Sequence, residues 1–349
     1  MKRVFLILFA MIFFSVTVYA TNVTVVMPTV NDAPTQAELT SIADTVSAEL
    51  VVDHFGKMDD MVNMPRGFAN ANASATNVSS NQSFQNYEIF SVMIGSINGV
   101  ILSSEPVNGM LTNQDPYFGD SIAAAINVGV NLSFIQENLY GSVKFGSLKM
   151  KYDDDSYKNT QIGIGLDYAI VPEWSYLYGL ARWRGISIGS GLIYNQTEVS
   201  VKDENLGDEY KYSQGLPTSG MVTTKPLVDY TMKMQTLTIP VHVVSSVQFL
   251  WLFNIGGGFG ADINVTTAKM DMVAHGIINA EVSGVVQESP GYFYSHASAT
   301  SKMEPKDIVS PKVLLSLGAN ISALKLDIPV SYYPVTKALS FGFNIGAAW

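Results

Sequence analysis

Histidine and carboxylate side chains are the groups in this 349-residue chain best suited to acid–base chemistry. The four histidines are His54, His242, His275 and His296. His275 or His296, beside a carboxylate such as Asp271 or Asp307, would supply the residue types of a hydrolytic centre. The same spacing is typical of exposed loop residues, so we predict no catalytic site and do not expect an enzyme.

Motifs for nucleotide, phosphate and zinc binding are missing from the sequence. It contains neither G-x-x-x-x-G-K-[ST] nor H-E-x-x-H. The glycine run 256–260 lies inside an alternating segment with no helix after it, which indicates a close approach of the backbone rather than a dinucleotide loop. No cysteine is present, which excludes disulfides and thiolate metal ligands. We therefore predict no cofactor and no metal.

Polar side chains instead recur at every second position within apolar segments. Alternate residues of a strand face opposite sides, so these polar residues share one face when the large apolar residues take the other. The predicted lumen-lining residues are Asn127, Asn131, Asp167, His242, Asp262, Asn264, Lys325, Asp327 and Asn344. Lys325 and Asp327, two apart on one face, are expected to pair with each other or with a neighbouring strand.

The last twelve residues show the alternation most clearly. Leu339, Phe341, Phe343, Ile345, Ala347 and Trp349 alternate with small residues. This ending resembles the terminal strand of bacterial outer-membrane β-barrels, whose alternating apolar residues and final aromatic form an assembly signal. The resemblance implies that Phe341, Phe343, Ile345 and Trp349 are recognised by the barrel-assembly machinery and that the barrel faces outer-membrane lipid. The architecture is also similar to uncharacterised spirochaete and Bacteroidetes barrels with an N-terminal helix.

The first twenty residues have the pattern of a cleaved signal peptide. Lys2 and Arg3 precede an apolar stretch over 4–18, and Val18-Tyr19-Ala20 has small residues at the positions that a signal peptidase reads. The sequence therefore predicts secretion through the inner membrane and location in the cell outer membrane.

Residues 21–83 are predicted to form a separate N-terminal segment. Thr35 and Glu38 have capping-box spacing, and apolar residues then recur at helical spacing, which predicts a helix near 35–55. This helix either lies in the periplasm beneath the barrel or plugs its lumen. The Asn-, Ala- and Ser-rich stretch over 65–83 is predicted to be a loop.

Composition agrees with a membrane barrel. Charged residues make up 14% of the chain, against roughly 25% in soluble domains, and the mean hydropathy is +0.19. Beyond the signal segment no apolar run approaches the ~20 residues of a membrane-spanning helix. The net charge of −10 argues against nucleic acid as a partner.

Residues 84–349 are predicted to form an all-β transmembrane antiparallel barrel of about ten strands. The segment 275–287 would add an outer hairpin or raise the count to about twelve. All but one of the long predicted connections fall on the side opposite to Trp349, including 203–230 and 269–310. Short turns such as 247–248 and 322–323 fall on the side of Trp349. Because outer loops are long and periplasmic turns short, this parity places Trp349 at the periplasmic rim.

Aromatic residues support the same orientation, because amphipathic rings prefer the headgroup level. The predicted inner girdle contains Phe134, Tyr140, Trp174, Tyr176, Trp183, Trp251 and Trp349. The predicted outer girdle contains Tyr117, Tyr152, Tyr157, Tyr194, Tyr230, Tyr332 and Tyr333.

The leading expectation for function is porin-like passage or transport of small solutes or hydrophobic compounds. The alternative is a surface-exposed adhesin or interaction barrel whose outer loops 203–230 and 269–310 bind a partner. A barrel of about ten strands has little free lumen once side chains fill it, so the contents of the lumen decide between the two.

Overall fold

The computed structural model describes residues 20–47, 63–75, 89–101, 119–176, 180–203, 210–213, 220–225, 227–302 and 308–349. The helices are α2 (Ala33–Ser41) and α5 (Asn63–Ala75). The strands are β1 (Ala20–Val26), β2 (Thr29–Val30), β3 (Phe90–Ile101), β4 (Asp120–Asn131), β5 (Leu139–Tyr152), β6 (Asp155–Val171), β7 (Trp174–Tyr176), β8 (Ala181–Asp203), β9 (Tyr210–Tyr212), β10 (Met221–Thr224), β11 (Leu227–Phe249), β12 (Phe253–Glu281), β13 (Gln287–Ser289), β14 (Gly291–Lys302), β15 (Val309–Ile321), β16 (Leu324–Tyr333) and β17 (Ala338–Ala348). Neither described helix has the length and apolarity needed to cross a bilayer. Apart from Ala20, the predicted signal peptide lies outside the described residues.

One sheet closes on itself. Following the pairings, the ring contains β3, β4, β5, β6, β8, β11, β12, β15, β16 and β17, and β17 pairs with β3 to complete it. Every pairing in this ring is antiparallel. The predicted all-β antiparallel barrel is therefore confirmed.

The two faces of this ring have the reverse of the usual distribution of polarity. Each strand exposes at least one large apolar side chain on its outer face: Ile94, Ile126, Phe145, Ile164, Ile188, Val241, Phe259, Leu317, Ile328 and Phe343. The inner face buries amides, hydroxyls and charged groups instead. A soluble barrel would place its polar residues outside, so this arrangement is that of a transmembrane barrel.

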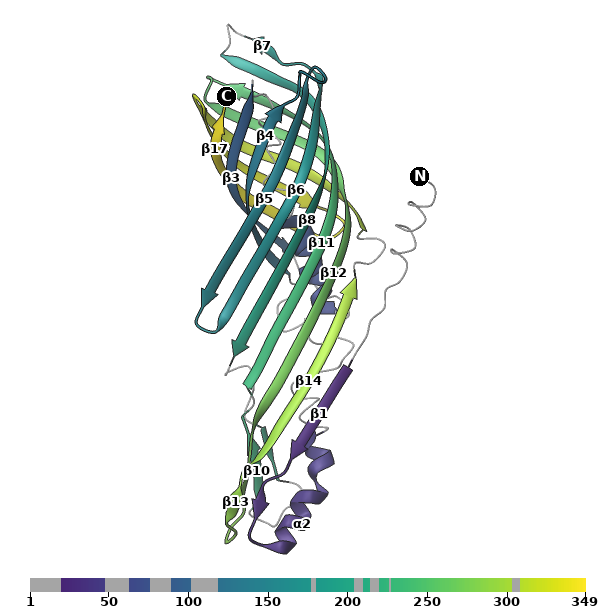
Figure 1. Cartoon of the computed structure of the whole chain (residues 1–349), viewed down its shortest axis with the longest axis vertical. Coiled ribbons are helices and arrows are strands. Elements are labelled where there is room, and N and C mark those ends of the chain that lie inside the picture. Colours follow the sequence, from purple (N-terminus) through teal and green to yellow (C-terminus); the bar gives the residue numbers. More distant parts are fainter. Residues whose placement is uncertain are drawn as a thin grey trace, which may run out of the picture.

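Three strands are much longer than a bilayer requires. β16 and β17 have 10 and 11 residues, within the roughly 9–11 needed to span a membrane. β8 and β11 each have 23 residues and β12 has 29. Their surplus lies at the end of the barrel opposite to Trp349, and Figure 1 shows the sheet continuing there far beyond the ring. We call this continuation, with β1, β9, β10, β13 and β14, the extension.

The extension replaces much of two predicted outer loops. On one edge of β12, Phe253–Ile263 pairs with β15 and closes the ring, whereas Thr267–Ile278 pairs with β14. β1 then pairs with β14. The predicted connection 269–310 is therefore a strand pair rather than a loop over most of its length, which agrees with the alternative of an outer hairpin at 275–287. The predicted connection 203–230 contains β9, β10 and the start of β11. The alternation of buried and exposed residues continues along β11 and β12 into the extension, where Leu227 and Ile277 are again exposed.

The N-terminal helix covers one face of the extension. Leu39, Ile42 and Val46, the predicted apolar face of this helix, join one buried cluster with strand residues of the extension such as Met234 and Phe293. This helix packs against the extension, at the end opposite to Trp349, so the predicted position of this helix as a plug in the lumen is wrong. The core of the extension also continues up to α5, where buried Ala69 belongs to it and partly buried Phe68 packs against it.

The start of this helix also differs from the prediction. Asp32 is the N-cap, and both the backbone N–H and the side-chain hydroxyl of Thr35 donate hydrogen bonds to Asp32 Oδ2. These hydrogen bonds hold the pKa of Asp32 below its usual value. α2 ends at Ser41, residues 43–47 are again helical, and the rest of the predicted helix lies outside the described residues.

Short turns occur at both ends of the ring. The turn between β5 and β6 lies at the extension end, and the turns between β11 and β12 and between β15 and β16 lie at the Trp349 end. Phe134, Trp174 and Trp251 are exposed there, as the predicted inner girdle requires.

The outer girdle needs correction at three of its tyrosines. Tyr157 bonds to the Ile122 backbone, Tyr230 packs against the buried cluster of the extension, and Tyr117 lies outside the described residues. Tyr333 is 1% exposed and points into the lumen. Its hydroxyl donates to buried Asp262, and this hydrogen bond explains the inward position of the ring.

Candidate functional site in the lumen and on the extension

The lumen contains a helix, α5, where the sequence indicates a loop. α5 contacts β3, β4, β11 and β12 around the ring, and all its residues from Ala69 to Ala75 are buried. The prediction of a loop over 65–83 is therefore wrong for 65–75. Asn, Ser and Gly are poor helix formers in water, but here the lumen wall supplies hydrogen-bond partners for the polar side chains.

The side chains of α5 are small, which suits a narrow barrel. Ala69, Ala71, Ala73 and Ala75 alternate with short polar residues. A Cβ added to Gly99 in the wall would overlap Ser74 Oγ and the Ala71 carbonyl oxygen. A helix with ordinary side chains is about 10–12 Å across, so only a slim helix fits this close to the strands.

Asn72 attaches α5 to three different strands. Its Nδ2 donates to Thr236 Oγ1 at 2.8 Å. Its Oδ1 accepts from Ser121 Oγ at 3.0 Å, Asn195 Nδ2 at 3.0 Å and Thr197 Oγ1 at 2.6 Å. Asn72 is fully buried, so these bonds form away from solvent, where losing one leaves an expensive unsatisfied group.

A buried ion pair lies across the lumen wall. Lys312 Nζ is 2.6 Å from Asp262 Oδ1, and neither side chain is exposed. Tyr333 donates to the other carboxylate oxygen at 2.9 Å. Tyr333 also packs in one cluster with Ala71 of α5, so this charged group and the helix share the same section of the barrel.

A second polar group lines the lumen nearer to the Trp349 end. His242 Nε2 lies 3.0 Å from Asp167 Oδ1. These two residues, Asn127 and Lys144 line a cavity of about 40 Å³. A water molecule needs roughly 10–15 Å³ of cavity volume, so the cavity has room for only a few water molecules. The cavity itself is therefore too small for a solute larger than a few atoms.

The structure places the predicted lumen residues on the inner face. Those that are buried are Asn127, His242, Asp262, Asn264, Asp327 and Asn344, and those that are partly exposed are Asn131, Asp167 and Lys325. No Lys325–Asp327 bond is found among the described residues. Asp327 instead accepts hydrogen bonds from Ser316 and from Asn344 Nδ2.

Residues central to the lumen were missed from the sequence. Lys144 and Lys312 are buried in positions of inward register, and the strict alternation of β5 and β15 could have revealed them. Asn72 carried no such signal, because a lone helix of Asn and Ala resembles a linker. The residues of the predicted assembly signal, Phe341, Phe343, Ile345 and Trp349, are all exposed on the outer face.

The histidines proposed for chemistry lie on the extension. His296 Nε2 is 3.7 Å from Asp271 Oδ1, beyond hydrogen-bonding distance, and Lys269 Nζ lies 2.9 Å from the other carboxylate oxygen. Asp307 and His54 lie outside the described residues. Among the described residues no three His, Asp or Glu side chains are grouped to hold a metal.

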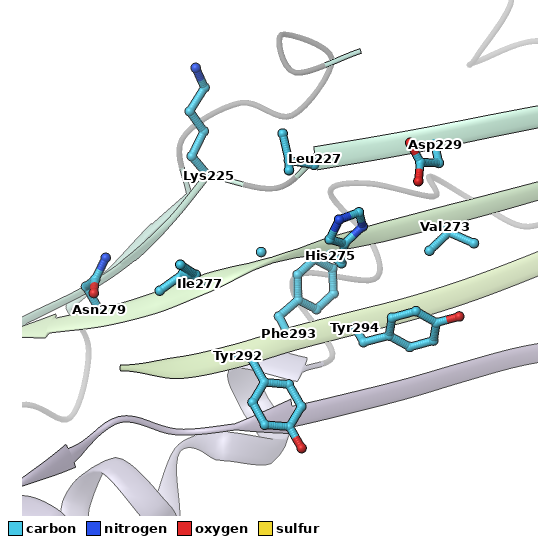
Figure 2. A pocket seen from close by; sticks show the side chains of 11 residues that line it. Lys225, Leu227, Asp229, Val273, His275, Ile277, Asn279, Tyr292, Phe293 and Tyr294 are labelled. Carbon is cyan, nitrogen blue, oxygen red and sulfur yellow. The ribbon is translucent and has the colours of Figure 1, made fainter. Parts of the chain in front are cut away.

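The extension also carries a groove of about 980 Å³. Its lining comes from β11, β12, β14 and the residue Lys225, as Figure 2 shows. Tyr292, Tyr294 and Ile277 are exposed apolar or aromatic groups in it. His275, Lys225 and Asp229 add polar and charged groups around this surface.

A comparison with protein-family models matches residues 23–349 to the family described as Lsa36-like. The chain belongs to the Lsa36-like family. The matched region of this Lsa36-like chain includes the N-terminal segment as well as the barrel, so the extension and α5 belong to the part that the family shares. No curated protein matches the sequence.

Solved structures that the chain is similar to are outer-membrane proteins. The translocator domain of autotransporter NalP from Neisseria meningitidis matches at 10% identity over 86% of this chain and 99% of that chain, with a TM-score of 0.34. Ail, the attachment invasion locus protein of Yersinia pestis, matches at 9% over 75% and 98%, with a TM-score of 0.25. Outer membrane protease OmpT from Escherichia coli matches at 8% over 77% and 96%, with a TM-score of 0.32. Because these TM-scores are low, the assignment of the fold rests on the strand pairings of this chain.

Proposed function

We propose that this protein is an integral barrel of the bacterial outer membrane whose extension binds a partner at the cell surface. The observation that carries the proposal is the position of α5, which fills the lumen section around Asn72 and is bonded to three strands. A barrel with such a lumen serves as an anchor. What it presents is the extension, the largest structure outside the membrane.

The orientation follows from the lengths of the connections. Barrels of this kind have short periplasmic turns and long extracellular elements. The turns between β11 and β12 and between β15 and β16 are short and lie at the Trp349 end. The extension lies at the opposite end, so it faces the outside of the cell.

The groove on the extension is the surface best suited to a partner. Tyr292 is 51% exposed and Tyr294 is 43% exposed, side by side with Ile277 across the β12–β14 pair. Tyrosine is enriched at protein interfaces because it buries a large area at little entropic cost and keeps a hydroxyl for hydrogen bonding. We infer that the partner is a protein of the surrounding matrix or host surface.

Two measurements test this proposal. The folded full-length protein in a planar bilayer should show no unitary current steps. Beads carrying the protein should be retained on an immobilised extracellular-matrix extract, and Tyr292→Ala with Tyr294→Ala should reduce retention at least several-fold. Tyr152→Ala is the matched control, because Tyr152 is 79% exposed at the same end but outside the groove. Steady unitary steps from the full-length protein, or equal retention of both variants, would contradict the proposal.

Passage of small solutes is the second candidate. The polar cavity between Asn127, Lys144, Asp167 and His242 supports it, because a purely structural filling would need no such side chains. Passage would require α5 to leave the ring. Deletion of residues 21–83 should then give a conducting barrel, and a solute-dependent current in the full-length protein would favour transport over anchoring.

We propose no catalytic role. His296 and Asp271 are a partly exposed cross-strand pair on the extension, and such pairs are ordinary on polar sheet surfaces. Hydrolysis of a peptide or ester by the full-length protein, lost in His296→Ala, would contradict this assignment.

A further inference from the structure

The described segments that precede and follow α5 lie at opposite ends of the barrel. Before α5, β1 pairs with β14 and α2 packs on the core of the extension. After α5, Ile89 donates its backbone N–H to the Trp349 carbonyl oxygen at 2.7 Å, so β3 begins at the Trp349 end. Figure 1 shows α2 at the extreme end of the molecule away from the C-terminus.

The direction of α5 agrees with this path. Its early residue Gly67 lies at the rim near the extension, where a Cβ on Gly119 would overlap the Gly67 carbonyl oxygen. Its last residue, Ala75, packs deeper against Ile97 and Ala123. The helix therefore runs from the extension end towards the Trp349 end.

The position of α5 inside the ring excludes a path along the outer wall. Asn72 bonds to β4 and to the neighbouring strands β8 and β11, and it is fully buried. The helix α5 also contacts β3, β12 and β17, so strands all around the ring face it. Because the chain is continuous, a helix inside the ring that connects segments at the two ends must carry the chain through the lumen.

We infer that the N-terminal segment reaches the outer side of the membrane through the lumen of its own barrel and forms part of the surface that the cell displays. The inference deepens the proposed function, since it rests on the same orientation. It assigns residues 20–47 to the exposed module, with α2 and β1 completing the extension rather than a periplasmic tail. The core of the extension joins Leu39, Ile42 and Val46 of the N-terminal segment to the strands. The sheet that carries the groove therefore packs against a segment that has passed through the barrel.

The absence of cysteine in the sequence gives a clean test by single-cysteine labelling. Three exposed positions suit it: Ala37 on α2, Asp154 in the turn between β5 and β6 at the extension end, and Glu137 in the turn at the Trp349 end. Each single variant, Ala37→Cys, Asp154→Cys or Glu137→Cys, is expressed in intact cells of a diderm host. A membrane-impermeant maleimide is added before or after the outer membrane is opened, and heat-modifiable gel mobility shows that each variant is folded.

The inference expects Ala37→Cys and Asp154→Cys to be labelled on intact cells and Glu137→Cys only after the membrane is opened. Labelling of Asp154→Cys with protection of Ala37→Cys would overturn the inference while leaving the orientation of the proposed function intact. Protection of both Ala37→Cys and Asp154→Cys, with labelling of Glu137→Cys, would overturn the orientation instead, although the two segments would still share one side.

Discussion

The buried ion pair Lys312–Asp262 in the lumen is stabilised by the opposite charge of each partner and by a hydrogen bond from Tyr333. Lys312 and Asp262 have no exposed side-chain surface, and Tyr333 supplies the second hydrogen bond to the carboxylate. In such a pair the desolvation penalty of each ion is balanced only while the other is present. Lys233 and Glu198, 3.3 Å apart but 52% and 34% exposed, are a surface pair of the same chemical kind.

Lys312→Met should lower the free energy of unfolding by about 3–5 kcal/mol, because it removes the ammonium group paired with buried Asp262. The interactions of that carboxylate with Lys144 and Tyr333 remain and replace the lost ion pair only in part. Lys233→Met should change it by about 1 kcal/mol or less. Tryptophan fluorescence during urea unfolding in lipid vesicles measures both. Adding Asp262→Leu to Lys312→Met should recover part of the loss, and equal effects of the two lysine variants would contradict the assignment.

At the scale of elements, α5 is a helix that depends on its surroundings. Its sequence has few strong apolar residues and many residues of low helix propensity. Isolated helices of this length are marginal in water even for good helix formers. The bonds to Asn72 and the close approach to Gly99 therefore hold α5 in the ring.

Asn72→Leu should release α5 from the wall while the ring stays folded. It removes four hydrogen bonds and leaves buried donors and acceptors on Ser121, Asn195, Thr197 and Thr236, each unsatisfied group costing about 1–3 kcal/mol. Faster hydrogen exchange over residues 63–75 and intermittent current steps in a bilayer are the expected results. Ala37→Leu, at an exposed position of α2, is the control and should change neither. Unchanged exchange in Asn72→Leu would show that packing alone holds the helix.

At the scale of the whole molecule, lipid and water divide the surface into zones. Large apolar side chains cover the outside of the ring, aromatic groups lie at its Trp349 end, and the extension continues beyond. The position of a residue along this axis therefore sets the effect of a charge placed there. Phe343 lies near the middle of β17, and Phe134 lies in a turn at the rim.

Phe343→Lys should destabilise the folded barrel by about 2–4 kcal/mol, because the ammonium group would enter the bilayer midplane. Phe134→Lys, the same change at the rim, should cost about 0–1 kcal/mol. Unfolding in lipid vesicles measures both values. Similar losses at the two positions would mean that the membrane does not surround the ring as the exposed apolar belt indicates.

The alternation of Phe343 with Asn344 is a property of the pleated backbone, so the faces of the strands could be predicted from the sequence alone. The barrel class, the ends of β16 and the inward register of Asp262 and Asp327 all follow from that local rule. The closure of the ring between β12 and β15, and the continuation of β12 along β14, depend on which residues far apart in the chain become neighbours. The helical state of 63–75 was decided in the same way, since Asn72 meets Asn195 and Thr236 only after the barrel has closed around it. Local patterns report the faces of strands, whereas pairings between distant residues decided what fills the lumen and at which end the N-terminal segment lies.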